Sequence, residues 1–296
     1  MDNYGSNVYK GLRDKWISKH KELQASLWAK HGDAIHEFVT NTKNFAIGSV
    51  SGLMLLSGPA VNLIAPPNSL AVQESKLPVD KSAFLVGDLA NIIPDEVREL
   101  TPEEEVNAGN VLTRDFGFPV AAELLGIRLN RSYGYIGAEQ HLARYPGDSM
   151  ASHFNPPAGG QEEAQKYYSS GMAPGLGGWG YFARSQAEMT QKEIDREKYY
   201  IAVQSFLAPG FAERTGEYIK FFKFRKMLVV NPNNGHAMVV VIGDAGPGAS
   251  TGKHLGGSPE VMKYLERFDG RQKGPVLYFF IDDPNDQVPL GPIEPK

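Results

Sequence analysis

The chain has 296 residues, of which 42% are apolar and 22% charged, which is the composition of a globular protein. Its net charge of −4 and the lack of any long Lys/Arg run argue against a nucleic-acid partner. It contains no cysteine, which excludes disulfides, thiolate metal ligands and a cysteine nucleophile.

Residues 1–43 are predicted to form an amphipathic helical segment. Trp16, Leu23 and Leu27 recur at helical spacing with charged residues between them. We expect this segment to pack on a partner or to lie along a membrane.

Residues 44–66 are predicted to form a transmembrane or signal-anchor segment, because their apolar core at 45–65 has the length of a bilayer-spanning helix. Seven Lys and Arg against five Asp and Glu precede it, which favours a cytoplasmic N-terminal side. The sequence therefore predicts an envelope protein, anchored in the membrane, with its C-terminal domain outside the cytoplasm. A buried core helix or a connector rich in Gly, Ser and Pro remains the alternative.

Residues 67–190 are predicted to be helical and loop-rich. Thr101, Pro102 and Glu104 form a capping box that begins a helix, and Gly117 is a plausible end. A second helix is expected at 119–129.

Two groups of side chains in this region are candidates for a site. Glu139 is a secondary candidate for a catalytic acid on a helix, with a solvated helix face as the alternative. Trp179 and Tyr181 lie among glycines, and exposed aromatic rings could stack on sugars. A loop fixed to the fold by buried aromatic side chains is the other interpretation of the second group.

Residues 195–296 are predicted to form a compact β domain. Short β-branched and aromatic runs recur there, and NPNNG at 231–235 is a hairpin signal between two of them. The fold class expected for the whole chain is therefore α+β, with N-terminal helices, a helical middle region and a C-terminal β domain.

The glycine-rich stretch at 243–257 is not a phosphate-binding loop. That motif needs a glycine where Pro247 stands and a Ser or Thr where His254 stands. We therefore expect no nucleotide, and no other feature indicates a cofactor. The histidines show no short spacing typical of a metal site, so none is predicted.

With its flanks, this stretch resembles the RlpA-like and expansin-like cell-wall proteins. The hairpin NPNNG, the run VVVIGDAGP and the helix start at Ser258 carry the resemblance. It implies a six-stranded double-psi β-barrel in the C-terminal third of the chain.

The resemblance also implies site residues. Asp244 falls on the aspartate of the D-x-G-P motif and is the first candidate for a catalytic acid, with turn capping as the alternative. Lys253 and His254 are candidates for binding the substrate. Gly256 replaces the aspartate that usually precedes the Leu-Ser helix start, and the histidine before the first hairpin strand has no counterpart.

Two functions follow from this resemblance. The first is an envelope enzyme that cleaves peptidoglycan glycan strands, a lytic transglycosylase with a single catalytic Asp. The second is a non-catalytic module for binding or assembling the cell wall, because the catalytic set is incomplete.

Overall fold

The structure is a computed structural model that describes residues 81–153, 170–267 and 273–296. The predicted helical segment 1–43 and the predicted membrane segment 44–66 lie outside these residues. Among the described residues, we find no helix with the length and apolar composition that a bilayer crossing requires.

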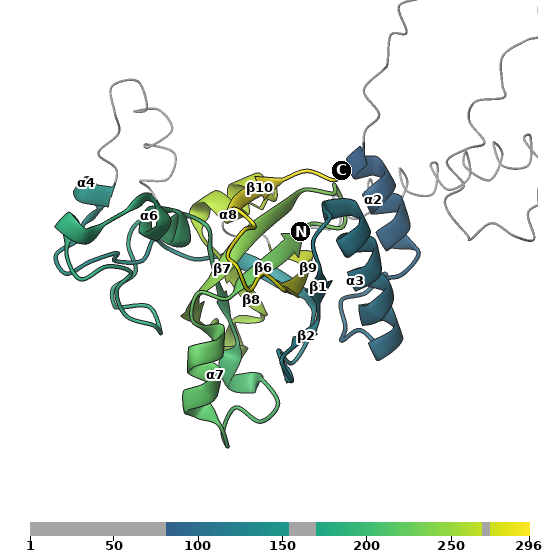
Figure 1. Cartoon of the computed structure of the whole chain (residues 1–296), viewed down its shortest axis with the longest axis horizontal. Helices are drawn as coiled ribbons and strands as arrows, with labels where there is room; N and C mark the ends of the chain where they lie inside the picture. Colours follow the sequence, from purple (N-terminus) through teal and green to yellow (C-terminus); the bar gives the residue numbers. More distant parts are fainter. Residues whose placement is uncertain (1–80, 154–169, 268–272) are drawn as a thin grey trace, which may run out of the picture. The chain divides into compact units, whose positions relative to one another are not determined.

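The described residues form a mixed α/β fold around a closed β-barrel (Figure 1). The helices are α2 (Lys81–Ala90), α3 (Pro102–Phe116), α4 (Met150–His153), α6 (Gln191–Lys198), α7 (Thr215–Phe222) and α8 (Pro259–Tyr264). The strands are β1 (Val120–Ala121), β2 (Glu123–Leu124), β3 (Ile127–Arg128), β4 (Tyr133–Ala138), β5 (Tyr200–Val203), β6 (Lys226–Val230), β7 (Ala237–Ala245), β8 (Leu255–Gly257), β9 (Gly274–Ile281) and β10 (Gly291–Ile293).

Six strands close the barrel in the order β4, β8, β5, β7, β6 and β9, and β9 pairs with β4 to complete the ring. The pairs β4–β8 and β5–β7 are parallel, and the other pairs in the ring are antiparallel. Outside the ring, β1 pairs with β9 and β10 pairs with β7, both antiparallel. This closed, mixed, six-stranded barrel is consistent with a double-psi fold.

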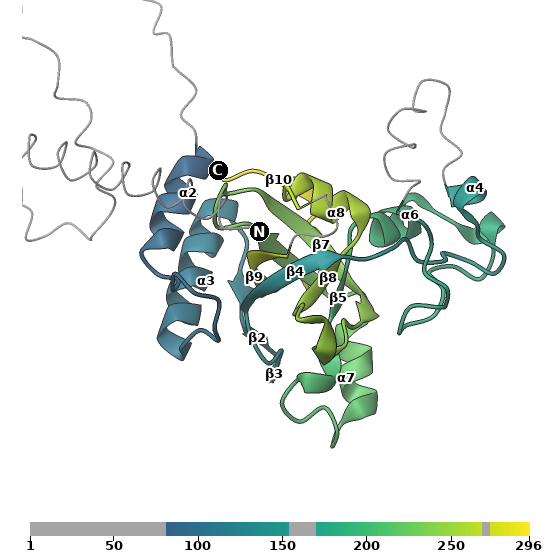
Figure 2. The ribbon, with the colours of Figure 1, turned by 180° about the vertical axis from the view of Figure 1, so that it is seen from behind.

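The barrel begins earlier in the chain than residue 195, where the predicted domain 195–296 starts. Strand β4 at 133–138 supplies one of its walls, between β8 and β9 (Figure 2). The residues just before it also differ from the prediction, because 119–129 form β1 and the β2–β3 hairpin instead of a helix. Pairing of Val120 with Ile281 in β9 outweighs the local helical pattern.

The helix at 101–116 is confirmed together with its signals. The hydroxyl of Thr101 accepts a hydrogen bond from the Glu104 amide, and Glu104 accepts one from the Thr101 amide. Gly117 ends the helix in the left-handed region, at φ 75°. Helices α2 and α3 lie side by side against one wall of the barrel (Figure 1).

Strand β7 is buried on both sides because its side chains alternate between the barrel interior and apolar clusters outside the barrel. Val240 and Ile242 point into the barrel, where they pack with Val229 and Phe280. Val239 points outward to the second core, which α2 and α3 complete. The hairpin predicted at 231–235 joins β6 to β7, with the Asn231 amide donating to the His236 carbonyl.

Candidate functional site

Glu139 follows β4 directly and forms an ion pair with Lys253. The Lys253 Nζ lies 2.7 Å from Glu139 Oε1 and 3.0 Å from the Ala138 carbonyl oxygen. The Glu139 amide donates to the Gly257 carbonyl, which extends the β4–β8 pairing by one residue. The side chains of Glu139 and Lys253 are 29% and 17% exposed, so the ion pair is partly open to solvent. Glu139 therefore lies at the end of a strand, not on the predicted helix.

Two glycines make room for this ion pair. Gly137 on β4 and Gly256 on β8 are directly paired. A Cβ at residue 256 would lie 2.2 Å from Glu139 Oε1, and one at residue 137 would lie 2.4 Å from Lys253 Cδ. The Glu139 side chain thus occupies the space that a side chain at residue 256, where the resemblance implies an aspartate, would fill.

His254 stacks on Tyr135 next to this pair. Their ring centroids are 5.9 Å apart with the planes at 20°, and the Tyr135 amide donates to His254 Nδ1 at 2.9 Å. Burial lowers the pKa of His254, and the charges of Arg131 and Lys273 lower it further. The Tyr135 side chain is 36% exposed. We call Tyr135, Glu139, Lys253 and His254 the Glu139 cluster.

Asp244 lies near the end of β7 and holds a loop. Its Oδ1 accepts hydrogen bonds from the amides of Gly178 and of Ala245, the latter at 2.7 Å. Burial raises the pKa of Asp244, although the two amide hydrogen bonds oppose this shift. These are the contacts expected of a turn-capping carboxylate, and they bind the 175–184 loop to the barrel.

The two aromatic candidates on this loop have different surroundings. Trp179 is only 8% exposed and packs with the barrel core, so its ring offers no open face to a sugar. Lys223 Nζ also donates a hydrogen bond to the Trp179 carbonyl oxygen at 3.2 Å. Tyr181, at 37% exposed, remains accessible. The loop is therefore held by a buried aromatic side chain, the second of the two interpretations.

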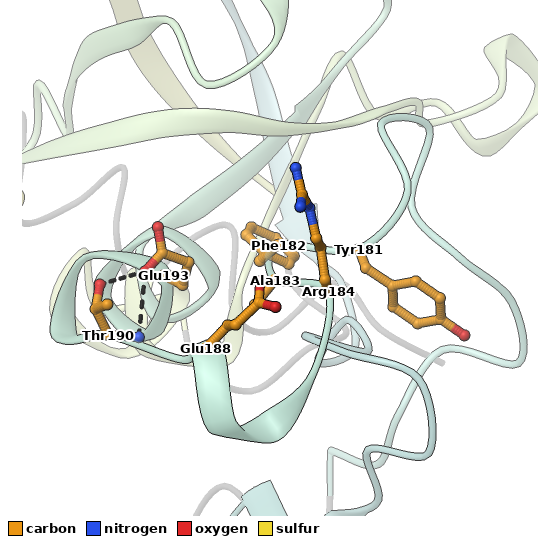
Figure 3. A pocket seen from close by; sticks show the side chains of 7 residues that line it. All are labelled: Tyr181, Phe182, Ala183, Arg184, Glu188, Thr190 and Glu193. Atoms are coloured by element: carbon orange, nitrogen blue, oxygen red, sulfur yellow. Dashed lines mark hydrogen bonds between the residues drawn. The ribbon is translucent and has the colours of Figure 1, made fainter.

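Tyr181 lines a hollow of about 460 Å³ between this loop and α6 (Figure 3). Arg184 and Glu188 lie between Tyr181 on one side and Glu193 on the other. Glu193 accepts a hydrogen bond from the Thr190 amide at 3.2 Å. The residues that line this hollow include neither Asp244 nor Glu139.

A third group was not predicted from the sequence. His141, His153 and Glu197 come from the segment after β4, from α4 and from α6, and their side chains converge in a buried cluster. His153 Nε2 lies 2.7 Å from Glu197 Oε2, and His141 Nδ1 lies 3.4 Å from Glu197 Oε1. Because these residues stand 12 and 44 positions apart in the chain, no short spacing reveals them.

The predicted site residues therefore fall in three places. Glu139 pairs with Lys253, and the next residue, His254, stacks on Tyr135. Asp244 holds the loop that carries the buried Trp179, and Tyr181 lines the hollow. No protein family matches this sequence, and the search of curated proteins finds no similar chain.

Proposed function

We propose that the barrel acts on the glycan strands of a cell wall and that the Glu139 cluster is its working site. The single observation behind this proposal is the place of the Glu139 carboxylate. It lies over Gly256, where RlpA-like and expansin-like proteins carry an aspartate on the barrel itself. A neighbouring strand thus supplies the carboxyl group that the sequence lacks at that position.

The surroundings of Glu139 suit a carbohydrate ligand. Tyr135 precedes Glu139 by four residues and has a partly exposed ring on which His254 stacks, and Lys253 pairs with Glu139. Four residues of extended chain span roughly 13 Å, so a glycan of several sugars stacked on Tyr135 would extend from that ring to the ion pair. The RlpA-like or expansin-like assignment of the double-psi barrel is part of this proposal.

The proposed reaction is non-hydrolytic cleavage between two sugars. The carboxyl group of Glu139 donates a proton to the glycosidic oxygen, and the bond from that oxygen to C1 of the muramic acid breaks. The 6-hydroxyl oxygen of the same sugar attacks C1 and returns its proton to the carboxylate. The products are a free 4-hydroxyl and a 1,6-anhydro sugar, and no water is consumed.

In this proposal Asp244 positions the 175–184 loop, because its Oδ1 already accepts two amide hydrogen bonds. An Asp244→Asn protein should keep cleavage, since asparagine still accepts hydrogen bonds through the same oxygen. Its free energy of unfolding should fall by only about 1 kcal/mol.

The experiment is to incubate the full chain with peptidoglycan sacculi and to analyse the released fragments by mass spectrometry. We expect anhydro-muropeptides from the wild type and from Asp244→Asn, and none from Glu139→Gln. Glu188→Gln, which changes an acidic residue of the hollow, is the matched control and should cleave normally. Cleavage by Glu139→Gln at the wild-type rate would contradict the proposal.

A non-catalytic wall-binding module is the second candidate, and one observation favours it. Lys253 Nζ lies 2.7 Å from Glu139 Oε1, so the only carboxylate of the cluster is already engaged in an ion pair. A wild type that sediments with sacculi and releases no anhydro product would support this function instead.

A further inference from the structure

The buried group His141, His153 and Glu197 has the composition of a metal site. Each residue offers one ligand atom, and these atoms all lie within 4.8 Å of one another. The side chains of His141, His153 and Glu197 are 0%, 4% and 3% exposed. Two imidazoles and one carboxylate are ligands that Zn²⁺ and similar divalent ions accept in proteins.

The spacing of the ligand atoms fits a small ion. Ligands at the usual Zn–N and Zn–O lengths of a tetrahedral site stand roughly 3.3 Å from one another. The distance from His141 Nδ1 to Glu197 Oε1 is 3.4 Å, and that from His153 Nε2 to Glu197 Oε2 is 2.7 Å. A small outward movement of the Glu197 carboxylate would admit the ion.

Asp148 supplies the outer partner that metal-bound histidines usually have. Its Oδ2 lies 3.1 Å from His153 Nδ1, so it can accept the proton of that nitrogen and leave Nε2 with its lone pair directed at Glu197. The side chain of Asp148 is itself fully buried and accepts hydrogen bonds from Arg144 at 3.0 Å and from Ser152 at 2.8 Å. The orientation of the His153 ring is therefore set by groups outside the cluster.

Glu260 on α8 gives an independent sign of a missing ligand. It is 8% exposed, and its Oε2 is buried without a hydrogen-bond partner. Ser258, which begins α8, donates to the carbonyl of Lys198, the residue after Glu197, so α8 and the end of α6 are in contact. Burial raises the pKa of Glu260 to about 7, a shift that the charge of His141 opposes and the charge of Glu197 increases. A buried carboxylate whose Oε2 has no hydrogen-bond partner is thus close enough to interact with the charges of His141 and Glu197.

We propose that His141, His153 and Glu197 bind a divalent transition-metal ion of the Zn²⁺ class. The ion would join the segment after β4, α4 and α6, which lie together on one side of the barrel (Figure 1). This inference is independent of the proposed action on glycans.

The test is a Zn²⁺ titration of the untagged full chain after treatment with a chelator, followed by calorimetry. We expect stoichiometric binding, a rise in melting temperature with Zn²⁺, and an intense visible absorption when Co²⁺ replaces it. His153→Gln and Glu197→Gln should lose at least 100-fold in affinity. His236→Gln is the matched control, because His236 bonds to the Tyr264 carbonyl outside the cluster, and it should bind as the wild type does.

A milder variant keeps the test valid if those proteins fail to fold. Asp148→Asn leaves all three ligands in place and should weaken binding by about 10-fold to 100-fold. Absence of Zn²⁺ and Co²⁺ binding by the folded wild type would overturn the proposal. So would Zn²⁺ binding that is unchanged in both Asp148→Asn and Glu197→Gln.

Discussion

At the scale of single residues, the least predictable feature is that Glu139 supplies the carboxyl group next to Gly256, instead of residue 256 itself. The sequence shows a glycine where the resemblance implies an aspartate, and Glu139 stands more than a hundred positions earlier. Only the parallel pairing of β4 with β8 brings the two residues together. Lys253 and His254 could be selected in advance because they follow a recognisable strand and turn.

A buried ion pair at the end of β9 gives a residue-scale prediction. Lys226 Nζ lies 2.7 Å from Asp283 Oδ2, and the two side chains are 13% and 6% exposed. Burial alone would raise the pKa of Asp283, but hydrogen bonds from Lys226 and from the amides of Gln287 and Val288 lower it. The stabilisation from Asp283 is therefore complete above its unfolded pKa of about 3.9 and is lost as the pH falls through the lower folded value.

Asp283→Asn should lower the free energy of unfolding by about 1–3 kcal/mol at neutral pH, because Lys226 loses the more buried of its two carboxylate partners and keeps only the exposed Asp286. The difference from the wild type should shrink as the pH falls below about 4. Urea unfolding at several pH values measures both effects. Asp282→Asn, at the exposed neighbouring position, is the control, and a deficit for Asp283→Asn that stays constant to the lowest pH would contradict this interpretation.

At the scale of elements, the sequence predicts best where the signal is local. The capping box of α3, the hairpin between β6 and β7, and the Ser258 start of α8 are all confirmed. The strands β5, β6, β7 and β9 lie within the predicted β-branched and aromatic runs. Prediction was wrong at 119–129, because β1 is held by pairing with a strand about 160 residues away, which periodicity cannot reveal.

The interior position of Val240 makes the barrel testable at this scale. Val240 is fully buried in the barrel core, so Val240→Asp places an unpaired charge there and should destabilise the domain by several kcal/mol. Thermal unfolding followed by circular dichroism measures the loss. Val106→Asp introduces the same change on α3, where the side chain is 61% exposed, and should leave the melting temperature nearly unchanged. Equal effects of the two substitutions would mean that Val240 is not in the core.

At the scale of the whole molecule, the candidate sites depend on contacts between distant parts of the chain. Glu139 meets Lys253 across 114 positions, and Asp244 meets Gly178 across 66. The His141 group joins three elements that no motif links. Sequence patterns therefore select residue types suited to chemistry, but the closed barrel decides which of them meet.

The membrane topology predicted from residues 1–66 is a whole-molecule prediction of its own. The basic N-terminal flank and the apolar run at 45–65 predict that the barrel lies outside the cytoplasm. A reporter that is active only in the cytoplasm, fused after Lys296, should be silent in cells. The same fusion lacking residues 1–66 should be active and serves as the control, whereas full activity of the complete fusion would exclude the anchor.

Glu139 fills the space that a side chain at residue 256 would occupy. The backbone at Gly256 is not left-handed, and the three atoms nearest to a Cβ there all belong to Glu139. Gly256→Asp should therefore lower the free energy of unfolding by about 1–3 kcal/mol in the wild type.

A double-mutant cycle at residues 139 and 256, followed by urea unfolding, measures this claim most directly. In a Glu139→Ala background, Gly256→Asp should be much less destabilising than in the wild type, with a coupling energy of about 0.5–3 kcal/mol between the two sites. If the proposed function is right, the double variant should also regain the glycan cleavage that Glu139→Ala lacks. Additive losses, with Gly256→Asp equally destabilising in both backgrounds, would contradict the claim.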